Sequence, residues 1–81
     1  MEARPGSNEK GIILEMIRSM RLATGLSQQE LADRLGWPCE VLRRIESGAR
    51  RADVMELREI CMACGRTMGS FAREFEERTG G

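Results

Sequence analysis

The chain has 81 residues, enough for one domain with one modest hydrophobic core and too few for a two-domain enzyme. Apolar residues make up 41% and charged residues 32%, which is typical of a globular protein and too hydrophobic for a wholly disordered chain. Histidine, the commonest general base and a frequent metal ligand, is absent, which weakens any interpretation as an enzyme.

The formal net charge is zero, which by itself argues against a nucleic-acid partner. The charges are distributed unevenly, however. Residues 34–51 hold five basic and two acidic side chains, whereas acidic residues outnumber basic ones on both sides of this segment. Positive charge is therefore concentrated in the middle of the chain.

No stretch approaches the ~20 apolar residues that cross a bilayer, and no signal segment opens the chain, so we expect a cytoplasmic protein without membrane contact. Three cysteines, an odd number, cannot all pair within one chain, and we expect three reduced thiols.

The first predicted helix starts at about Glu9, after a segment 1–8 that mixes Pro, Gly, Ser and charge and is expected to be flexible. Its apolar residues recur at helical spacing, and Gly25 offers a stop. These apolar residues are Ile13, Met16, Ile17 and Met20.

Two short helices are predicted next. Ser27 and Glu30 have the spacing of a capping box, which starts a helix over residues 28–35, and Gly36 can end it. Pro38 suits the first position of a helix over residues 38–46, and Gly48 closes it. The buried side of this helix is predicted to carry Val41, Leu42 and Ile45.

Two further helices complete the chain. Asp53 and Glu56 form a second capping box, and Gly65 ends the helix that follows. Thr67 can cap a last helix, which leaves residues 79–81 as a tail. The inner faces are predicted to carry Leu57, Ile60, Cys61 and Cys64 in one helix and Met68, Phe71, Ala72 and Phe75 in the other. We therefore expect an all-α domain of five helices over residues 9–78, with the six methionines as core filler.

Residues 25–48 read GLSQQELADRLGWPCEVLRRIESG, two short helices joined at a glycine. The segment resembles the helix-turn-helix of the Xre/Cro/lambda-repressor family. The positions that carry the resemblance are Gly25, Leu26, Ser27, Gln28, Leu31, Ala32, Leu35, Gly36, Ile45, Glu46 and Gly48. The resemblance extends over roughly residues 11–77 and implies a compact lambda-repressor-like DNA-binding domain.

Arg21 and Glu46 are similar to a pair that bridges the first and third helices in this family, and an Arg fork on a carboxylate has suitable geometry. The alternative is two solvated charges of little energetic consequence.

In such a motif the start of the recognition helix enters the major groove of double-stranded DNA. The outward residues of the helix at 38–46 are the candidates for reading bases: Cys39, Glu40, Arg43 and Arg44. An arginine can donate two hydrogen bonds to guanine, and Glu40 can accept from cytosine. Cys39 donates only weakly and Glu40 brings negative charge toward phosphates, and both depart from the family pattern.

The DNA backbone is expected to meet the start of the second helix and the loop after the third. Ser27 and Gln28, with the amides around them, are candidates for phosphate contacts, although Ser27 is expected to use its hydroxyl for capping. Arg50 and Arg51 are candidates for phosphate contacts, the alternative being an ordinary solvated loop.

The C-x-x-C at Cys61 and Cys64 is interpreted as core packing, because a structural zinc site needs four ligands and no histidine or second C-x-x-C is present. We therefore predict no metal and no cofactor, the alternative being a metal shared across a dimer. The short chain is also expected to leave no room for a ligand pocket.

The predicted function is sequence-specific DNA binding by a homodimeric transcriptional regulator, a repressor on family grounds, without catalytic activity. The predicted dimer interface is the last helix and the tail FAREFEERTGG, in which Phe71 and Phe75 supply apolar area, unless these aromatics cap the monomer core. The alternative function is a protein-interaction module on the same fold, such as an antitoxin or accessory subunit, which zero net charge and Glu40 favour.

Overall fold

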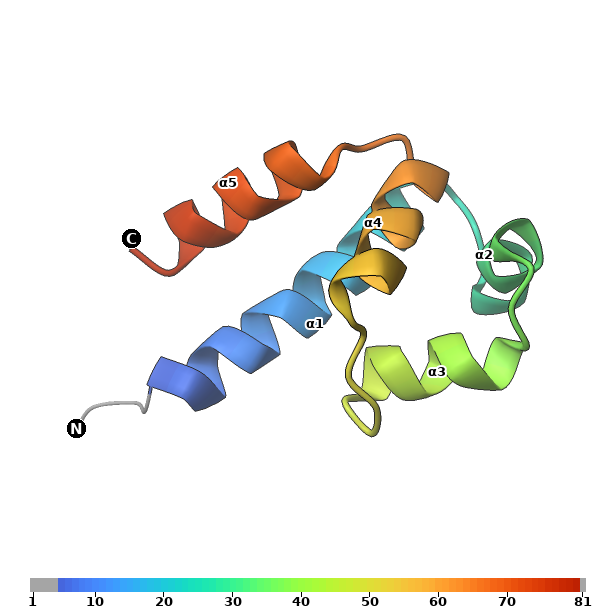
Figure 1. Cartoon of the computed structure of the whole chain (residues 1–81), viewed down its shortest axis with the longest axis horizontal. Helices are drawn as coiled ribbons and strands as arrows, with labels where there is room; N and C mark the ends of the chain where they lie inside the picture. The colour runs from blue at the N-terminus through green and yellow to red at the C-terminus, as the bar shows by residue number, and fades with distance from the viewer. Residues whose placement is uncertain (1–4, 81) are drawn as a thin grey trace.

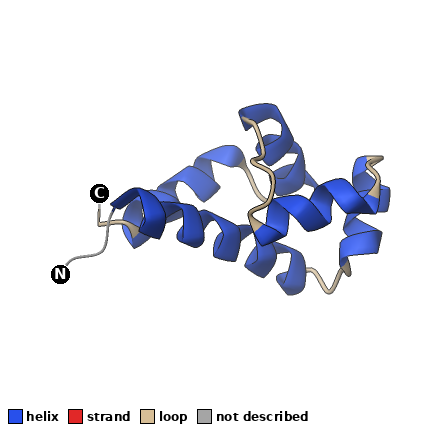
Figure 2. Cartoon of the chain, turned by 90° about the horizontal axis from the view of Figure 1, so that it is seen from below, coloured by secondary structure: helices blue, strands red, loops and turns tan. Residues whose placement is uncertain are grey.

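Five α-helices make up the regular structure. The computed structural model describes the backbone of residues 5–80 and the side chains of residues 9–80. The helices are α1 (Pro5–Ala23), α2 (Gln28–Leu35), α3 (Cys39–Ser47), α4 (Val54–Ala63) and α5 (Met68–Arg78), as Figure 1 shows. Residues 5–80 contain no strand (Figure 2), and the predicted all-α, five-helix fold is confirmed.

Two helix starts differ from the prediction, both at prolines. Helix α1 begins at Pro5 rather than Glu9, because a proline fits the first helical position, where an amide hydrogen would have no partner. The predicted flexible segment 1–8 is therefore helical from residue 5 onward, and its first four residues lie outside the described part. Pro38 is the N-cap of α3 and not its first residue: its ψ of 140° is extended, and its carbonyl oxygen accepts from the amide of Val41.

Both predicted capping boxes are present. The hydroxyl of Ser27 accepts from the amide of Glu30 at 3.1 Å, and the Glu30 carboxylate accepts from the amide of Ser27 at 2.9 Å. Asp53 and Glu56 make the same reciprocal pair at 2.8 and 3.0 Å. Each cap stabilises its helix by about 1 kcal/mol, so the sequence fixes where α2 and α4 begin.

Ten apolar side chains form the core. They are Met16, Ile17, Met20, Leu31, Ala32, Leu42, Ile45, Ile60, Cys61 and Phe71. Three expected core residues are instead exposed: Met55, Met62 and Ala72. Met55 lies in the first turn of α4 and Met62 on its outer side, so the methionines are only partly core filler.

The helix-turn-helix segment occupies one end of the molecule. Helix α3 packs on both α1 and α2, and α5 packs on α1 and α4. In Figure 1 the α2–α3 pair lies at the opposite end from the start of α1 and the end of α5. The outer face of α3 is therefore not covered by another helix in the part of the chain that the structure describes. Within residues 5–80, no helix is both long enough and apolar enough to span a bilayer.

Gly48 ends α3 in the left-handed region, with φ of 86°, and a Cβ there would lie 3.1 Å from Cδ1 of Leu14. Gly36 ends α2 with φ of 74°, and a Cβ there would meet nothing within 4 Å. We expect Gly36→Ala to cost about 1 kcal/mol, the conformational penalty alone, and Gly48→Ala about 2 kcal/mol, because Leu14 must also move. Urea denaturation of both variants checks this, and equal losses would show that the Leu14 contact adds nothing.

Candidate nucleic-acid interface

Helices α2 and α3 are joined by a tight turn that fixes the face presented by α3. Gly36 adopts the left-handed conformation, and the amide of Trp37 donates back to the carbonyl oxygen of Ala32 at 2.9 Å. Ala32 is completely buried, so a larger side chain there would push the two helices apart.

The inward side of α3 carries Leu42 and Ile45, both buried, with Val41 half-buried against the core. Three of the four predicted base-reading residues, Glu40, Arg43 and Arg44, are exposed. The fourth, Cys39, is half-buried and packs against the core, because cysteine is small and weakly polar.

The three exposed residues are not equivalent electrostatically. Arg43 pairs with Glu40 one helical turn earlier, although both side chains stay more than half exposed. Arg44 has no carboxylate within ion-pair distance among residues 9–80. Arg44 is thus the guanidinium of α3 whose donors are available without breaking an ion pair.

The start of α2 uses its side chains internally. Ser27 caps the helix, as expected. The side chain of Gln28 makes a hydrogen bond inside the protein, because its Nε2 donates to Glu46 Oε1 at 3.0 Å. Phosphate contact at this end would therefore fall to the first amides of the helix, which have no intrahelical acceptor.

The two loop arginines, Arg50 and Arg51, also differ in whether they form an ion pair. Arg50 makes a bidentate pair with Glu56, at 3.1 and 2.7 Å, whereas Arg51 is exposed and has no carboxylate within ion-pair distance among residues 9–80. The hydrogen bonds to Arg50 lower the pKa of Glu56 below its ordinary value, and the pKa of Arg50 is raised in turn.

The lowered pKa of Glu56 makes stability depend on pH in a defined direction. Its contribution is fully present above the ordinary pKa of 4.5 and is lost as pH falls through the lower folded-state pKa. We expect Glu56→Gln, which can keep the capping box, to flatten the decrease of unfolding free energy below pH 4.5. Chemical denaturation between pH 3 and 7 measures this, and a pH dependence in Glu56→Gln equal to that of the wild type would contradict it.

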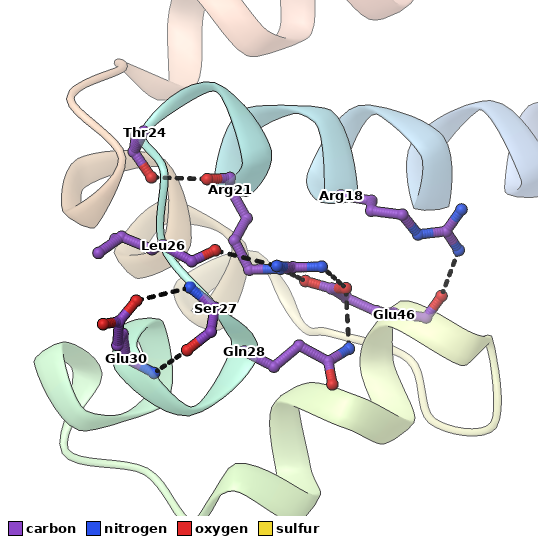
Figure 3. A network of polar contacts seen from close by, with 8 residues as sticks. All are labelled: Arg18, Arg21, Thr24, Leu26, Ser27, Gln28, Glu30 and Glu46. Carbon is purple, nitrogen blue, oxygen red and sulfur yellow. Dashed lines mark hydrogen bonds and ion pairs between the residues drawn. The ribbon is translucent and has the colours of Figure 1, made fainter.

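Arg21 and Glu46 form the centre of a polar network between α1, α2 and α3 (Figure 3). The guanidinium donates from Nε to Oε2 at 2.8 Å and from Nη2 to Oε1 at 3.0 Å, while Nη1 donates to the carbonyl oxygen of Leu26 at 3.0 Å. Glu46 is only 2% exposed, and its hydrogen bonds raise the pKa of Arg21. The carboxylate is thus buried with a bidentate partner and the Gln28 amide, and no buried side-chain polar atom within residues 9–80 lacks a hydrogen-bond partner.

Two members of this network were not anticipated. Arg18 donates to the carbonyl oxygen of Glu46 at 3.3 Å, and Gln28 donates to its carboxylate. Arg18 precedes Arg21 by three residues and so lies on the same side of α1, which is a usable signal. Nothing local to Gln28 distinguishes an internal amide from one that faces DNA.

The cysteines of the C-x-x-C lie in and beside the core. Cys61 is buried, Cys64 is half-buried, and desolvation raises the pKa of both thiols. Residues 9–80 contain no group of three His, Cys, Asp or Glu side chains arranged to hold a metal ion.

The comparisons with known proteins agree with this geometry. Residues 15–75 match the model of a helix-turn-helix domain family. The structure is similar to that of an XRE-family like protein from Pseudomonas syringae pv. tomato str. DC3000, with 30% sequence identity, a TM-score of 0.85, and coverage of 91% of this chain and 90% of that chain. No curated protein matches the sequence. The fold, the exposed face of α3 and these similarities together show that the chain belongs to the Xre-type helix-turn-helix family of DNA-binding regulators.

Proposed function

We propose that the protein is a sequence-specific regulator of transcription that reads the major groove of double-stranded DNA with α3. The observation that carries this proposal is Arg44, exposed and without an ion-pair partner among residues 9–80, on the outer face of the second helix of the motif. Arg44 can donate two hydrogen bonds to O6 and N7 of a guanine, the commonest specific contact in the major groove.

The ion pair between Glu40 and Arg43 would break when the protein binds DNA. In the free protein each satisfies the other, so binding must exchange an exposed ion pair of small energy for contacts with bases or phosphates. Glu40 can accept from N4 of cytosine, and Arg43 is then free to donate to a neighbouring guanine or phosphate. Such an exchange would restrict binding to operators that satisfy both residues.

Phosphate contacts would fix the position of α3 in the groove. Arg51, exposed and unpaired within residues 9–80, is the strongest candidate, followed by the first amides of α2, Gln28 among them. Arg50 would contribute less, because its guanidinium is already held by Glu56.

We propose that the protein binds its operator as a homodimer and acts as a repressor, the latter on family grounds alone. The predicted interface needs revision at Phe71, which is buried in the monomer core, and Phe75, which packs half-buried against it. The exposed apolar residues Val54 and Met55, 69% and 64% exposed at the start of α4, are the better candidates for the dimer contact.

Selection of bound duplexes from a random DNA library at near-physiological salt, followed by sequencing, tests the proposal without a prior guess at the operator. A palindrome with half-sites about one helical turn apart would support a dimeric, sequence-specific regulator. A single half-site would contradict the dimer, and failure of folded protein to enrich any motif would contradict sequence-specific reading.

The second candidate is a protein-interaction module, such as an antitoxin or accessory subunit. Val54 and Met55 favour it, since large exposed apolar side chains side by side are typical of protein contacts. A library without an enriched motif, together with co-purification of a defined partner that is lost in Met55→Glu, would support this function instead.

A further inference from the structure

A pocket of about 440 Å³ lies between the first half of α1, the end of α3 and the start of α4. The expectation that a chain of this length has no room for a ligand pocket was therefore wrong. The apolar wall consists of Ile13, Leu14, Ile17, Ile45, Ala52 and Leu57. The loop that joins α3 to α4 supplies Arg50, Arg51 and Ala52 to the lining, and α1 supplies Ile13, Leu14 and Ile17.

The pocket stays open because some of the residues that line it are small and others are only half-buried. Gly48 and Ala52 line the pocket where α3 ends and α4 is about to begin, so the apolar part of this wall lacks large side chains. Ile17 and Ile45 are buried and form the floor, while Ile13, Leu14 and Leu57 are half-buried at the sides. The volume falls in the range of about 300–1,000 Å³ that is usual for small-molecule sites.

The rim of the pocket is positively charged. Lys10, Arg50 and Arg51 all line it, and Arg50 is held by Glu56. Neither Lys10 nor Arg51 has a carboxylate within ion-pair distance among residues 9–80. An aliphatic wall under two cations of this kind is complementary to a molecule with an apolar tail and an anionic head.

We propose that this pocket binds a small amphipathic carboxylate, with its aliphatic tail on the apolar wall and its carboxylate between Lys10 and Arg51. The wall carries aliphatic side chains without a single aromatic ring, which suits a linear hydrocarbon tail better than a planar ligand.

Binding would interfere with DNA, because Arg51 cannot neutralise a ligand carboxylate and a phosphate equally well at the same time. This second step depends on the proposed function, whereas binding to the pocket does not. Gly48, which ends the DNA-reading helix, lines the same space, so the ligand would also contact the end of α3.

Titration of the 15N-labelled protein with sodium decanoate, kept below its micelle-forming concentration, tests the binding step. We expect saturable shifts of backbone amides that line the pocket, and at least tenfold weaker binding of decanol, which lacks the charge, and of butyrate, which lacks the tail. Arg51→Gln should weaken decanoate binding about fivefold. Arg58→Gln, which removes a charge from α4 away from the pocket, should leave it unchanged.

The proposal would be overturned by no saturable shift at the pocket, by equal affinity for decanol, or by equal effects of the two arginine variants. Shifts of the same amides with protein concentration alone would also overturn it, since a second copy would then cover the pocket.

The effect on DNA is a separate readout. Decanoate should weaken DNA binding by the wild-type protein and have less effect on Arg51→Gln. Decanoate binding without any DNA binding would leave the pocket assignment intact and contradict only the proposed function.

Discussion

Replacing Arg21 with alanine is expected to destabilise the fold by about 3 kcal/mol, because the substitution leaves the carboxylate of Glu46 buried without its bidentate partner. The Arg21 side chain is only 11% exposed and that of Glu46 only 3%, so water cannot replace the lost hydrogen bonds without opening the contact between α1 and α3. For a domain of this size the melting temperature should fall by roughly 12–24 °C, which thermal denaturation followed by circular dichroism measures.

The matched control is Arg43→Ala, which removes an arginine from an ion pair that is more than half exposed. Its cost should stay below about 1 kcal/mol. The double variant Arg21→Met/Glu46→Leu should recover part of the loss, because it removes the buried charge along with its partner. Similar melting temperatures for Arg21→Ala and Arg43→Ala would contradict the interpretation of a buried bridge.

Most of the fold could be predicted because its signals are local. Ser27 with Glu30 and Asp53 with Glu56 carry complete capping boxes within four residues, and Gly36 and Gly48 stand where the chain must adopt positive φ. The apolar periodicity then identifies the inner faces. Each of these patterns is independent of the rest of the chain, so their agreement sufficed to predict five helices.

The side-chain partners at the interface could not be predicted in the same way. Gln28 could have faced a phosphate or Glu46, and Arg50 could have faced DNA or Glu56; both choices depend on distances between helices that no local pattern encodes. The pocket beside Arg51 could not be predicted for the same reason, because its space depends on how far apart α1, α3 and α4 lie. For Phe71 the sequence showed an apolar residue but not whether it packs in the monomer core or in a dimer contact; the structure places it in the core.

The second large effect is expected at Arg44. Arg44→Ala should weaken binding to the selected operator by about 1–3 kcal/mol and relax the preference at one base position, because it removes a bidentate donor to a base edge. Binding to random DNA should change much less. Fluorescence anisotropy with the operator and with a scrambled duplex of equal length measures the two affinities.

Arg51→Ala is the matched comparison, since it removes from the neighbouring loop an arginine that is also exposed and without an ion-pair partner among residues 9–80. A phosphate contact has no sequence preference, so this variant should weaken both duplexes alike and reduce the slope of log K against log salt by about 1. Its melting temperature should match that of the wild type, because no hydrogen bond within residues 9–80 depends on its side chain.

The two arginines therefore separate base reading from backbone contact within one motif. If Arg44→Ala and Arg51→Ala lower both affinities by the same factor and change the salt slope equally, α3 does not read bases through Arg44. The remaining candidates on that face would then be Arg43 and Glu40. In that case Glu40→Gln should strengthen binding to DNA of random sequence, because it frees Arg43 and removes a negative charge that faces the phosphates.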